Sequence, residues 1–289
     1  IVENPPVDVG ITNFYLAYHS QNNRTLLEDI AKLHIAACPK LTYEAKHCRF
    51  KKGEQKDRLR IGFLSSFFWN HTVGKLSRGI IEHFSRDHFD VIVFRLPGKK
   101  DEISEVIDQA ADKVVPLYRK LDRDWKIIAE EELDILFYYD IGMDQYSYFL
   151  SFARLAPVQA VSWGHPDTTG IPNIDYFISS DLLEDPGTSR QYTEQLVQLS
   201  VLPTYYFPPK LPEKTFDRVE FSLPDEGSLY VCPQSLFKLH PEFDKVIGDL
   251  LRHDPLGRLV LIDDGTGGHL NNLIIERIGR SCPDIVDRV

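Results

Sequence analysis

Strand-like and helix-like segments alternate from residue 58 to about residue 205, and this alternation constrains the fold more than any other feature of the chain. Apolar runs predict strands over 59–65, 89–97, 114–117, 133–141, 157–164 and 174–181. Apolar residues at helical spacing predict helices between them, over 74–86, 101–112, 122–132 and 144–155. Strands that are separated by helices pair in parallel, and the helices cover both faces of the sheet. The alternation therefore predicts an α/β fold with a doubly wound, Rossmann-like domain.

The flanking segments divide the chain into four predicted parts. Residues 1–57 are a helical lead-in that ends in a charged linker, and residues 58–207 hold the alternating segments. Residues 208–227 are rich in Pro and charge, which is typical of an interdomain linker. Residues 228–289 begin a second α/β unit, whose last helix leads toward a strand that is not reached. Since the chain also lacks an initiator Met, we expect a piece of a longer protein that stops inside its second domain.

Composition excludes several classes of protein. The net charge is −10 and no long Lys/Arg cluster appears, which argues against nucleic acid and anionic membrane as partners. The four cysteines show no Cys-x-x-Cys spacing and no Cys/His set of a zinc site. We therefore expect free thiols in a reducing cytoplasm and no metal site. No signal peptide and no apolar run near 18 residues is present, so we expect no membrane segment.

Ligands of open parallel sheets bind beyond the carboxyl ends of the strands, and this rule selects the loop "SSFFWNHTVGKL" (65–76) first. His71 lies in it where a strand passes into a helix. The positive end of the helix dipole disfavours an imidazolium, so the ring is expected to stay neutral and able to accept a proton. Asn70 or Thr72 is expected to cap the helix. The alternative for His71 is a capping or packing role.

Two further loops follow strands of the same sheet. Asp140 in "YYDIGMD" (138–144) is expected to point toward the ligand edge, with Gly142 permitting close backbone approach. The alternative is that Asp140 or Asp144 caps the next helix. The loop "WGHPDTTGIPNIDY" (163–176) is rich in small and rigid residues, which suits a ligand such as a sugar, although an ordinary structural loop has the same composition.

The fourth loop, "CPQSLFKLHPEFD" (232–244), follows the first strand of the second unit. Lys238 precedes a helix there, and a lysine beside a helix N-terminus suits an anion, while a solvated lysine is the alternative. The glycine-rich stretch 264–269 is not a Walker loop, because it lacks the Lys-Ser/Thr pair.

Taken together and in this order, the four loops resemble one family. "LRIGFLSSFFWNHTVGKL", "DILFYYDIGMD", "APVQAVSWGHPDTTGIPNIDYFISSD" and "YVCPQSLFKLHPEFD" are similar to the catalytic region of bacterial relatives of the O-linked N-acetylglucosaminyltransferases, a family shared with plant protein O-fucosyltransferases. The resemblance covers roughly residues 11–289. It implies a GT-B glycosyltransferase with two Rossmann-like lobes, inverting and metal-independent, that moves a sugar from a nucleotide donor to Ser or Thr of proteins. Tetratricopeptide repeats that recruit substrates usually precede this region in the family.

The resemblance also implies roles for individual residues. His71 matches the family's Asn-His histidine, which was proposed as a base at the sugar end of the cleft. Gly164 and Pro166 match the Gly-x-Pro backbone along the donor sugar, with His165 standing where eukaryotic relatives carry Tyr. Lys238 matches the lysine on the donor diphosphate, and a cation and a helix N-terminus can stabilise that leaving group without Mg²⁺. A further set of donor-binding residues is implied at Asp140 and Ser235.

Donor, acceptor and activity stay open on the sequence alone. UDP-N-acetylglucosamine is the default donor, with UDP-glucose and a GDP-sugar as alternatives and no cofactor. The alternative functions are transfer to a small molecule or glycan, and a non-catalytic interaction module of the same fold. We expect little turnover from the isolated chain, and an exposed sheet edge in its second unit that would support association.

Overall fold

A computed structural model describes residues 2–49, 56–263, 265 and 268–289. Most of the predicted linker at 51–57 and half of the glycine-rich stretch at 264–269 lie outside the described residues. The chain separates into two compact units. Unit 1 comprises the residues up to Ala17 and Gln21–Pro208, and unit 2 comprises Tyr18–Ser20 and Pro209–Val289.

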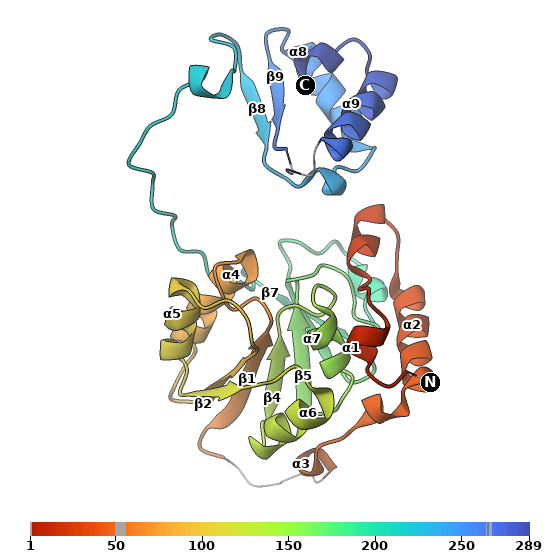
Figure 1. Ribbon diagram of the computed structural model, residues 1–289, viewed down its shortest axis with the longest axis vertical. Coiled ribbons are helices and arrows are strands. Elements are labelled where there is room, and N and C mark those ends of the chain that lie inside the picture. The colour runs from red at the N-terminus through yellow and green to blue at the C-terminus, as the bar shows by residue number, and fades with distance from the viewer. Residues whose placement is uncertain (1, 50–55, 264, 266–267) are drawn as a thin grey trace. The chain divides into compact units, whose positions relative to one another are not determined.

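Unit 1 is built on a parallel sheet of seven strands in the order β3-β2-β1-β4-β5-β6-β7 (Figure 1). The strands are β1 (Leu59–Ser65), β2 (Phe89–Arg95), β3 (Lys113–Pro116), β4 (Ile135–Tyr138), β5 (Val158–Ser162), β6 (Tyr176–Ser180) and β7 (Gln195–Leu199). The predicted parallel, doubly wound α/β fold is confirmed. Strand β7 was not predicted, because its residues are half exposed at the edge of the sheet and form no long apolar run.

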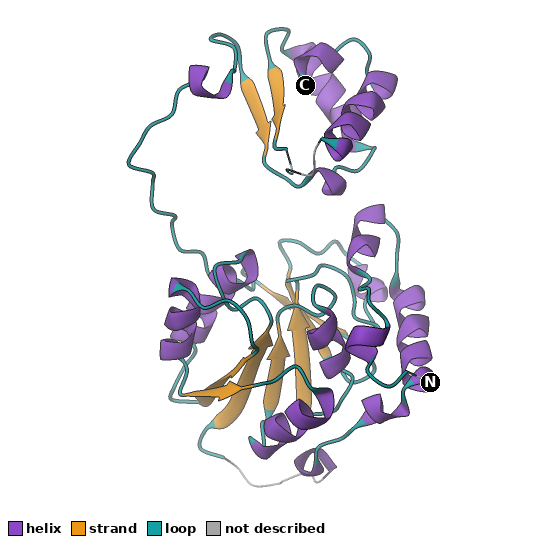
Figure 2. Ribbon diagram, viewed as in Figure 1, coloured by secondary structure: helices purple, strands orange, loops and turns teal. Residues whose placement is uncertain are grey.

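The helices of unit 1 cover both faces of this sheet (Figure 2). Those that follow β1 in the chain are α4 (Thr72–His83), α5 (Glu102–Ala110), α6 (Leu121–Glu130) and α7 (Gln145–Leu150). Successive residues of a strand point to opposite faces. Phe63 of β1 accordingly lies in the core with α4 and α5, while its neighbour Leu64 lies in the core with α6 and α7. Helix α7 ends five residues earlier than predicted, at Leu150, because the chain turns there toward β5.

The lead-in belongs to unit 1 and packs on the same sheet. It holds α1 (Pro5–Asp8), a 3₁₀ helix at Phe14–His19, α2 (Arg24–Ala37), a 3₁₀ helix at Pro39–Thr42, and α3 (Lys46–Arg49). Ala31 of α2 and Leu41 are fully buried in the core that also contains α6 and α7. Except for Tyr18–Ser20, residues 2–49 are therefore structurally part of the domain that carries the sheet.

Unit 2 is a smaller α/β unit in which β8 (Leu229–Cys232) and β9 (Arg258–Leu261) pair in parallel. Helices α8 (Phe243–His253) and α9 (His269–Ser281) bury their apolar faces in a separate core. The described chain ends in a 3₁₀ helix at Val286–Arg288 after α9. Arg277 of α9 donates two hydrogen bonds, of 2.7 and 2.9 Å, to the buried carboxylate of Asp244 and so ties α9 to α8.

Candidate active site

The carboxyl ends of β1 and β4 mark the point at which the strand order of unit 1 reverses. The chain runs outward from β1 to β2 and β3, then returns to the other side of β1 with β4. Ligands of doubly wound sheets bind in the crevice at such a switch point. Leu64 pairs in register with Tyr138, so the loops after β1 and β4 start at the same level. These are the loops that carry His71 and Asp140.

His71 is itself the N-cap of α4. Its Nδ1 accepts a hydrogen bond of 3.2 Å from the backbone N–H of Val73, so His71 has the capping role that was its alternative, and the prediction that Asn70 or Thr72 caps this helix is wrong. The ring stacks on Phe67 with ring centroids 4.4 Å apart. Burial, and then the positive charge of Lys75, lowers the pKa of the imidazole. The expected neutral ring is therefore favoured, and because Nδ1 accepts, Nε2 carries the proton.

Asp140 lies directly after β4 and is completely buried. The carboxylate accepts a hydrogen bond of 2.7 Å from the backbone N–H of Ser66, which links the loops after β1 and β4. Its Oδ1 is buried without a hydrogen-bond partner among the described residues. Burial and the nearby charge of Asp144 raise the pKa of Asp140 to about 7. The expectation that Asp140 faces the open ligand edge is therefore not met; the cap of α7 is Asp144, whose side chain accepts from Ser147 N–H.

The loop after β5 comes very close to the loop after β4. A Cβ on Gly164 would lie 1.6 Å from the carbonyl oxygen of Tyr139, so only glycine fits there. Gly142 has φ +97°, and a Cβ on it would lie 2.8 Å from Nδ1 of His165. The buried ring of His165 contacts the carbonyl oxygen of Phe14 through Nε2 at 3.0 Å. His165, followed by Pro166, is thus held between the lead-in and the β4 loop.

A small pocket opens beside these loops within unit 1. Its lining comes from the lead-in, the β4 loop, α7 and the β5 loop: Asn13, Leu27, Ile141, Gly142, Tyr148, His165, Thr168 and Thr169. The Tyr148 hydroxyl is buried without a hydrogen-bond partner among the described residues. Of the predicted donor-binding residues of unit 1, His165 lines this partly polar pocket, next to Gly142 of the β4 loop.

Arg119 lies at the same edge and was missed by the sequence analysis. It follows β3, and its guanidinium contacts the Ser66 hydroxyl at 3.1 Å and the Asp144 carboxylate at 3.3 Å. No motif marks it, because a single arginine after a short strand has no sequence pattern of its own. It adds a cation to the edge formed by β1 and β4.

The two candidate residues of the fourth loop lie in unit 2. Lys238 ends a 3₁₀ turn at Leu236–Lys238 after β8, and its ammonium lies 5.8 Å from the ring centroid of Phe237. Ser235 is the N-cap residue of this turn without a side-chain cap bond. The structure thus groups His71, Asp140, Gly164, His165 and Pro166 at one edge of unit 1, and Lys238 with Ser235 in unit 2.

Among the residues that the structure describes, no group of three or more His, Cys, Asp or Glu residues is arranged to hold a metal ion. None of the helices in the described part of the chain is long and apolar enough to cross a membrane.

Comparison with known proteins adds relatives at low identity. The chain is 27% identical over 228 residues to a probable UDP-N-acetylglucosamine–peptide N-acetylglucosaminyltransferase, SEC, of Arabidopsis thaliana, covering 74% of this chain and 23% of the relative. It is 29% identical over 163 residues to a UDP-glucose:protein N-beta-glucosyltransferase of Actinobacillus pleuropneumoniae, covering 55% of this chain and 25% of the relative. The chain thus spans about a quarter of the length of these relatives.

A solved structure shows the same fold. A point mutant of the O-GlcNAc transferase of Thermobaculum terrenum matches 94% of this chain and 51% of its own length, with a TM-score of 0.77 and 22% identity. This likeness supports a GT-B architecture. The model of the family described as glycosyl transferase family 41 matches residues 16–208, which include the edge formed by β1, β4 and β5. Since that match covers more than half of the sequence, the chain belongs to glycosyl transferase family 41.

Proposed function

We propose that this chain is part of an inverting glycosyltransferase that moves a sugar from a nucleotide-sugar donor to Ser or Thr of a protein. The observation that carries the proposal is the switch-point edge, where Asp140 ties the β1 loop to the β4 loop and His71 opens α4 beside them. The family membership supports the reaction class. The proposal assigns the sugar to the edge of unit 1 and the diphosphate to unit 2.

His71 is proposed to act on the reacting sugar or the acceptor through Nε2. Because Nδ1 accepts from Val73 N–H, the neutral ring presents an Nε2–H donor. In this arrangement the ring orients a hydroxyl or a departing oxygen by donating a hydrogen bond. Accepting the acceptor's proton at Nε2 would first require that the Nδ1 bond be given up and the tautomer changed.

Lys238 and Ser235 are proposed to bind the donor diphosphate. Loss of a nucleoside diphosphate builds negative charge on the leaving oxygens, and a nearby ammonium stabilises it electrostatically. This charge stabilisation needs no divalent metal ion, so we propose metal-independent transfer that EDTA leaves unchanged.

The donor is proposed to be UDP-N-acetylglucosamine, with UDP-glucose as the first alternative. Relatives named for each of these donors match the chain. A GDP-sugar is a further alternative donor, because His165 stands where eukaryotic relatives carry Tyr and Asp140 lies in the neighbouring loop. All four cysteines are free thiols, which supports the proposed cytoplasmic location. Tetratricopeptide repeats before residue 1 would favour protein acceptors over a small molecule or glycan.

The deciding experiment uses the full-length protein with a panel of nucleotide sugars. Donor hydrolysis and the mass of intact acceptor proteins are measured with and without EDTA. We expect a mass increase of one sugar with a single preferred donor. His71→Ala and Lys238→Ala are expected to lower turnover by about a hundredfold each, the size typical for loss of one positioned polar group.

Matched controls separate these roles from general damage. His88→Ala removes an exposed histidine before β2, at the opposite edge of the sheet, and Lys245→Ala removes an exposed lysine of α8. Both controls should keep parental turnover. Unchanged turnover in Lys238→Ala would remove the diphosphate role. Absence of hydrolysis and transfer with every donor would leave the non-catalytic interaction module as the better reading.

The chain of 289 residues is expected to bind donor weakly and turn over little by itself. It spans about half of the matched O-GlcNAc transferase structure. Robust sugar transfer by this chain alone would contradict that expectation.

A further inference from the structure

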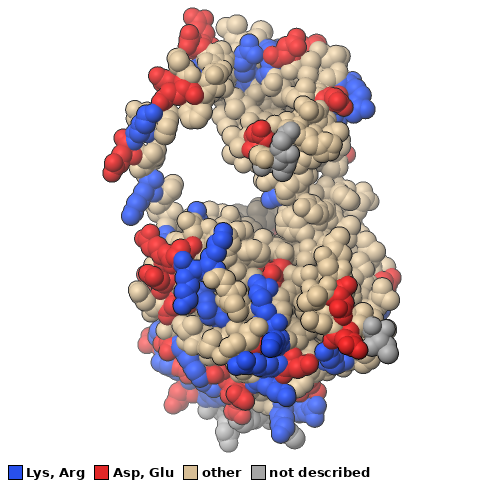
Figure 3. Space-filling model, in the orientation of Figure 1, with Lys and Arg blue, Asp and Glu red and all other residues tan. Residues whose placement is uncertain are grey.

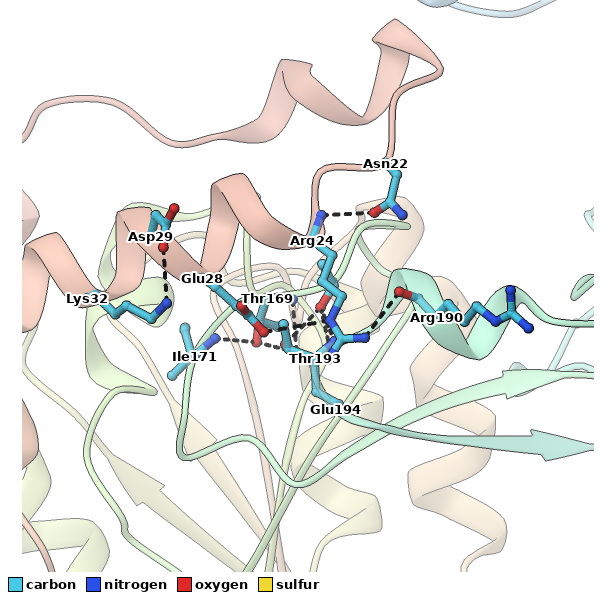
Figure 4. A network of polar contacts seen from close by, with 11 residues as sticks. Asn22, Arg24, Glu28, Asp29, Lys32, Thr169, Ile171, Arg190, Thr193 and Glu194 are labelled. Atoms are coloured by element: carbon cyan, nitrogen blue, oxygen red, sulfur yellow. Dashed lines mark hydrogen bonds and ion pairs between the residues drawn. The ribbon is translucent and has the colours of Figure 1, made fainter.

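The loop after β5 is fixed by a buried carboxylate from a distant part of the chain. Glu194 immediately precedes β7 and is only 5% exposed. One carboxylate oxygen accepts from the backbone N–H of Thr169 at 2.9 Å and from the hydroxyl of Thr169. The other oxygen accepts from the hydroxyl of Thr168 at 2.6 Å. Figure 4 shows Glu194 directed toward Thr169, with Thr193 beside them.

Three donors converge on this one carboxylate, and this explains how a charged group is accommodated there. Burying a carboxylate is costly unless hydrogen bonds replace its hydration, and bonds to a charged acceptor are about twice as strong as neutral ones. The network continues on both sides. Thr193 N–H donates to the Thr168 hydroxyl at 2.9 Å, and Ile171 N–H donates to the Thr169 hydroxyl at 3.1 Å. The Thr169 hydroxyl therefore makes two hydrogen bonds, and the Thr168 hydroxyl makes three, the third with the Thr193 hydroxyl at 2.9 Å.

The lead-in fixes the same loop from the other side. The side-chain amide of Asn23 donates to the Asp167 carboxylate at 2.8 Å and to the carbonyl of Leu16 at 3.2 Å. Gly170 has φ +70°, and a Cβ on it would lie 2.4 Å from the backbone of Leu27 in α2. Residues 167–170 are thus held between α2 and the start of β7.

We propose that Glu194 is a positioning residue that acts through Thr168 and Thr169 to hold the 164–170 loop in its donor-binding shape. The inference rests on the proposed function, in which Gly164 and Pro166 line the donor sugar. Gly164 lies five residues before Thr169 in the same loop and is packed against the Tyr139 carbonyl, so a shift at Thr169 is expected to displace it. Neither Glu194 nor Thr169 was singled out by sequence motifs.

The test compares four variants of the full-length protein with the parent. Glu194→Gln keeps the side-chain shape but replaces one acceptor oxygen with an NH₂ group, which cannot accept from the threonine donors. Thr169→Val keeps the shape but removes the hydroxyl that serves both Glu194 and Ile171. Thr169→Ser keeps that hydroxyl and is the conservative rescue. Thr188→Val, on an exposed turn, controls for loss of a threonine hydroxyl elsewhere.

We expect Glu194→Gln and Thr169→Val to raise the donor KM about tenfold, the size of one charge-assisted hydrogen bond. The acceptor KM should stay within about twofold, and Thr169→Ser and Thr188→Val should match the parent. Hydrogen–deuterium exchange should rise at residues 168–171 in the first two variants only, because the Thr169 amide loses its acceptor geometry.

Two failures are distinguishable. If the parent is active and both Glu194→Gln and Thr169→Val keep its donor KM, the positioning role is wrong while the proposed function stands. Equal loss of donor and acceptor affinity, together with a lowered melting temperature, would also overturn the role and reduce it to general stability. If the parent neither binds nor transfers any sugar of the panel, the proposed function fails and the donor role of Glu194 falls with it.

Discussion

As the pH rises, the parent should lose free energy of unfolding in unit 1 through Asp140, and the Asp140→Asn variant should not. The carboxyl of Asp140 is fully buried, and its pKa is raised from 3.8 to about 7 by burial and by Asp144. In the unfolded chain this group ionises near pH 4. Between these two values the folded state holds a proton that the unfolded state has released, so raising the pH favours unfolding.

The magnitude follows from the size of the shift. Each pKa unit corresponds to about 1.4 kcal/mol, so the full difference of roughly three units approaches 4 kcal/mol. Between pH 5 and pH 7 the parent should lose about 2 kcal/mol of unfolding free energy through Asp140 alone. Asparagine does not titrate, so the Asp140→Asn variant lacks this loss. Where the new NH₂ group has no hydrogen-bond acceptor, it lowers the unfolding free energy of the variant by an amount that does not depend on pH.

Urea unfolding monitored by tryptophan fluorescence measures the free energy of unfolding of unit 1 at each pH. The three tryptophans, Trp69, Trp125 and Trp163, all lie in that unit. The difference between parent and Asp140→Asn should change by about 2 kcal/mol in favour of the variant from pH 5 to pH 7. Asp122→Asn is the matched control, since that carboxylate is 67% exposed and its difference should not depend on pH in this range. A constant difference for Asp140→Asn would refute the reasoning, because Asp140 would then be ionised throughout.

Three more predictions concern packing. Gly164→Ala should destabilise unit 1 by about 2 kcal/mol or more, measured by urea unfolding, because the new Cβ would lie 1.6 Å from the Tyr139 carbonyl oxygen. Arg277→Met should destabilise unit 2 by about 3–5 kcal/mol, measured by hydrogen exchange in α8, because the buried Asp244 carboxylate loses its partner. The chain alone should self-associate in sedimentation experiments, because apolar side chains such as Val231 of β8 (56% exposed) are uncovered in unit 2.

Each of these has a matched comparison. Gly98→Ala should be harmless, since a Cβ there meets nothing within 4 Å. Arg280→Met removes an exposed arginine of α9 whose guanidinium donates to the Glu276 carbonyl of the same helix, and α8 should exchange as in the parent. Val231→Lys should reduce self-association. A monomeric parent at every concentration would contradict the last prediction, and parental stability of Gly164→Ala would contradict the close approach.

The fold could be predicted from the sequence where periodicity is strong. Strands such as β1 and β2 are buried on both faces and read as continuous apolar runs, and α5 and α6 show one apolar face. The edge strand β7 was not predicted, because a strand at the edge of a sheet needs no long apolar run. The lead-in was predicted as a part distinct from the sheet domain because a charged linker follows it. Ala31 and Leu41 are nevertheless buried in the core of that domain.

The site was predictable only in outline. The rule for parallel sheets places residues after β1, β4 and β5 at one edge, and the structure does so. Which side chains face solvent there depends on contacts that no spacing encodes. The buried carboxylate of Asp140 accepts a hydrogen bond from the backbone N–H of Ser66, which lies 74 residues earlier in the chain. His71, and neither of its neighbours, caps α4, because its Nδ1 accepts from the backbone N–H of Val73. Glu194 and Thr169 are distant in sequence, so their pairing had no local signal.

The shifted pKa values at this edge fit a division of labour between the two units under the proposed function. Burial lowers the pKa of the His71 imidazole, which favours its neutral form at neutral pH, and raises the pKa of Asp140 to about 7, which favours the neutral carboxyl at more acidic pH. Arg119, the cation found beside them, is paired with Asp144. A neutral, hydrogen-bonding edge suits a sugar, which carries hydroxyls and no charge, but offers little to a departing diphosphate. The compensating charge must then come from elsewhere, and Lys238 after β8 is the group proposed to supply it. Raising the salt concentration should therefore weaken donor binding in the parent but much less in Lys238→Ala, while His71→Ala should keep the parental salt dependence. Equal salt dependence in all three proteins would place the diphosphate on other cations and undo this division.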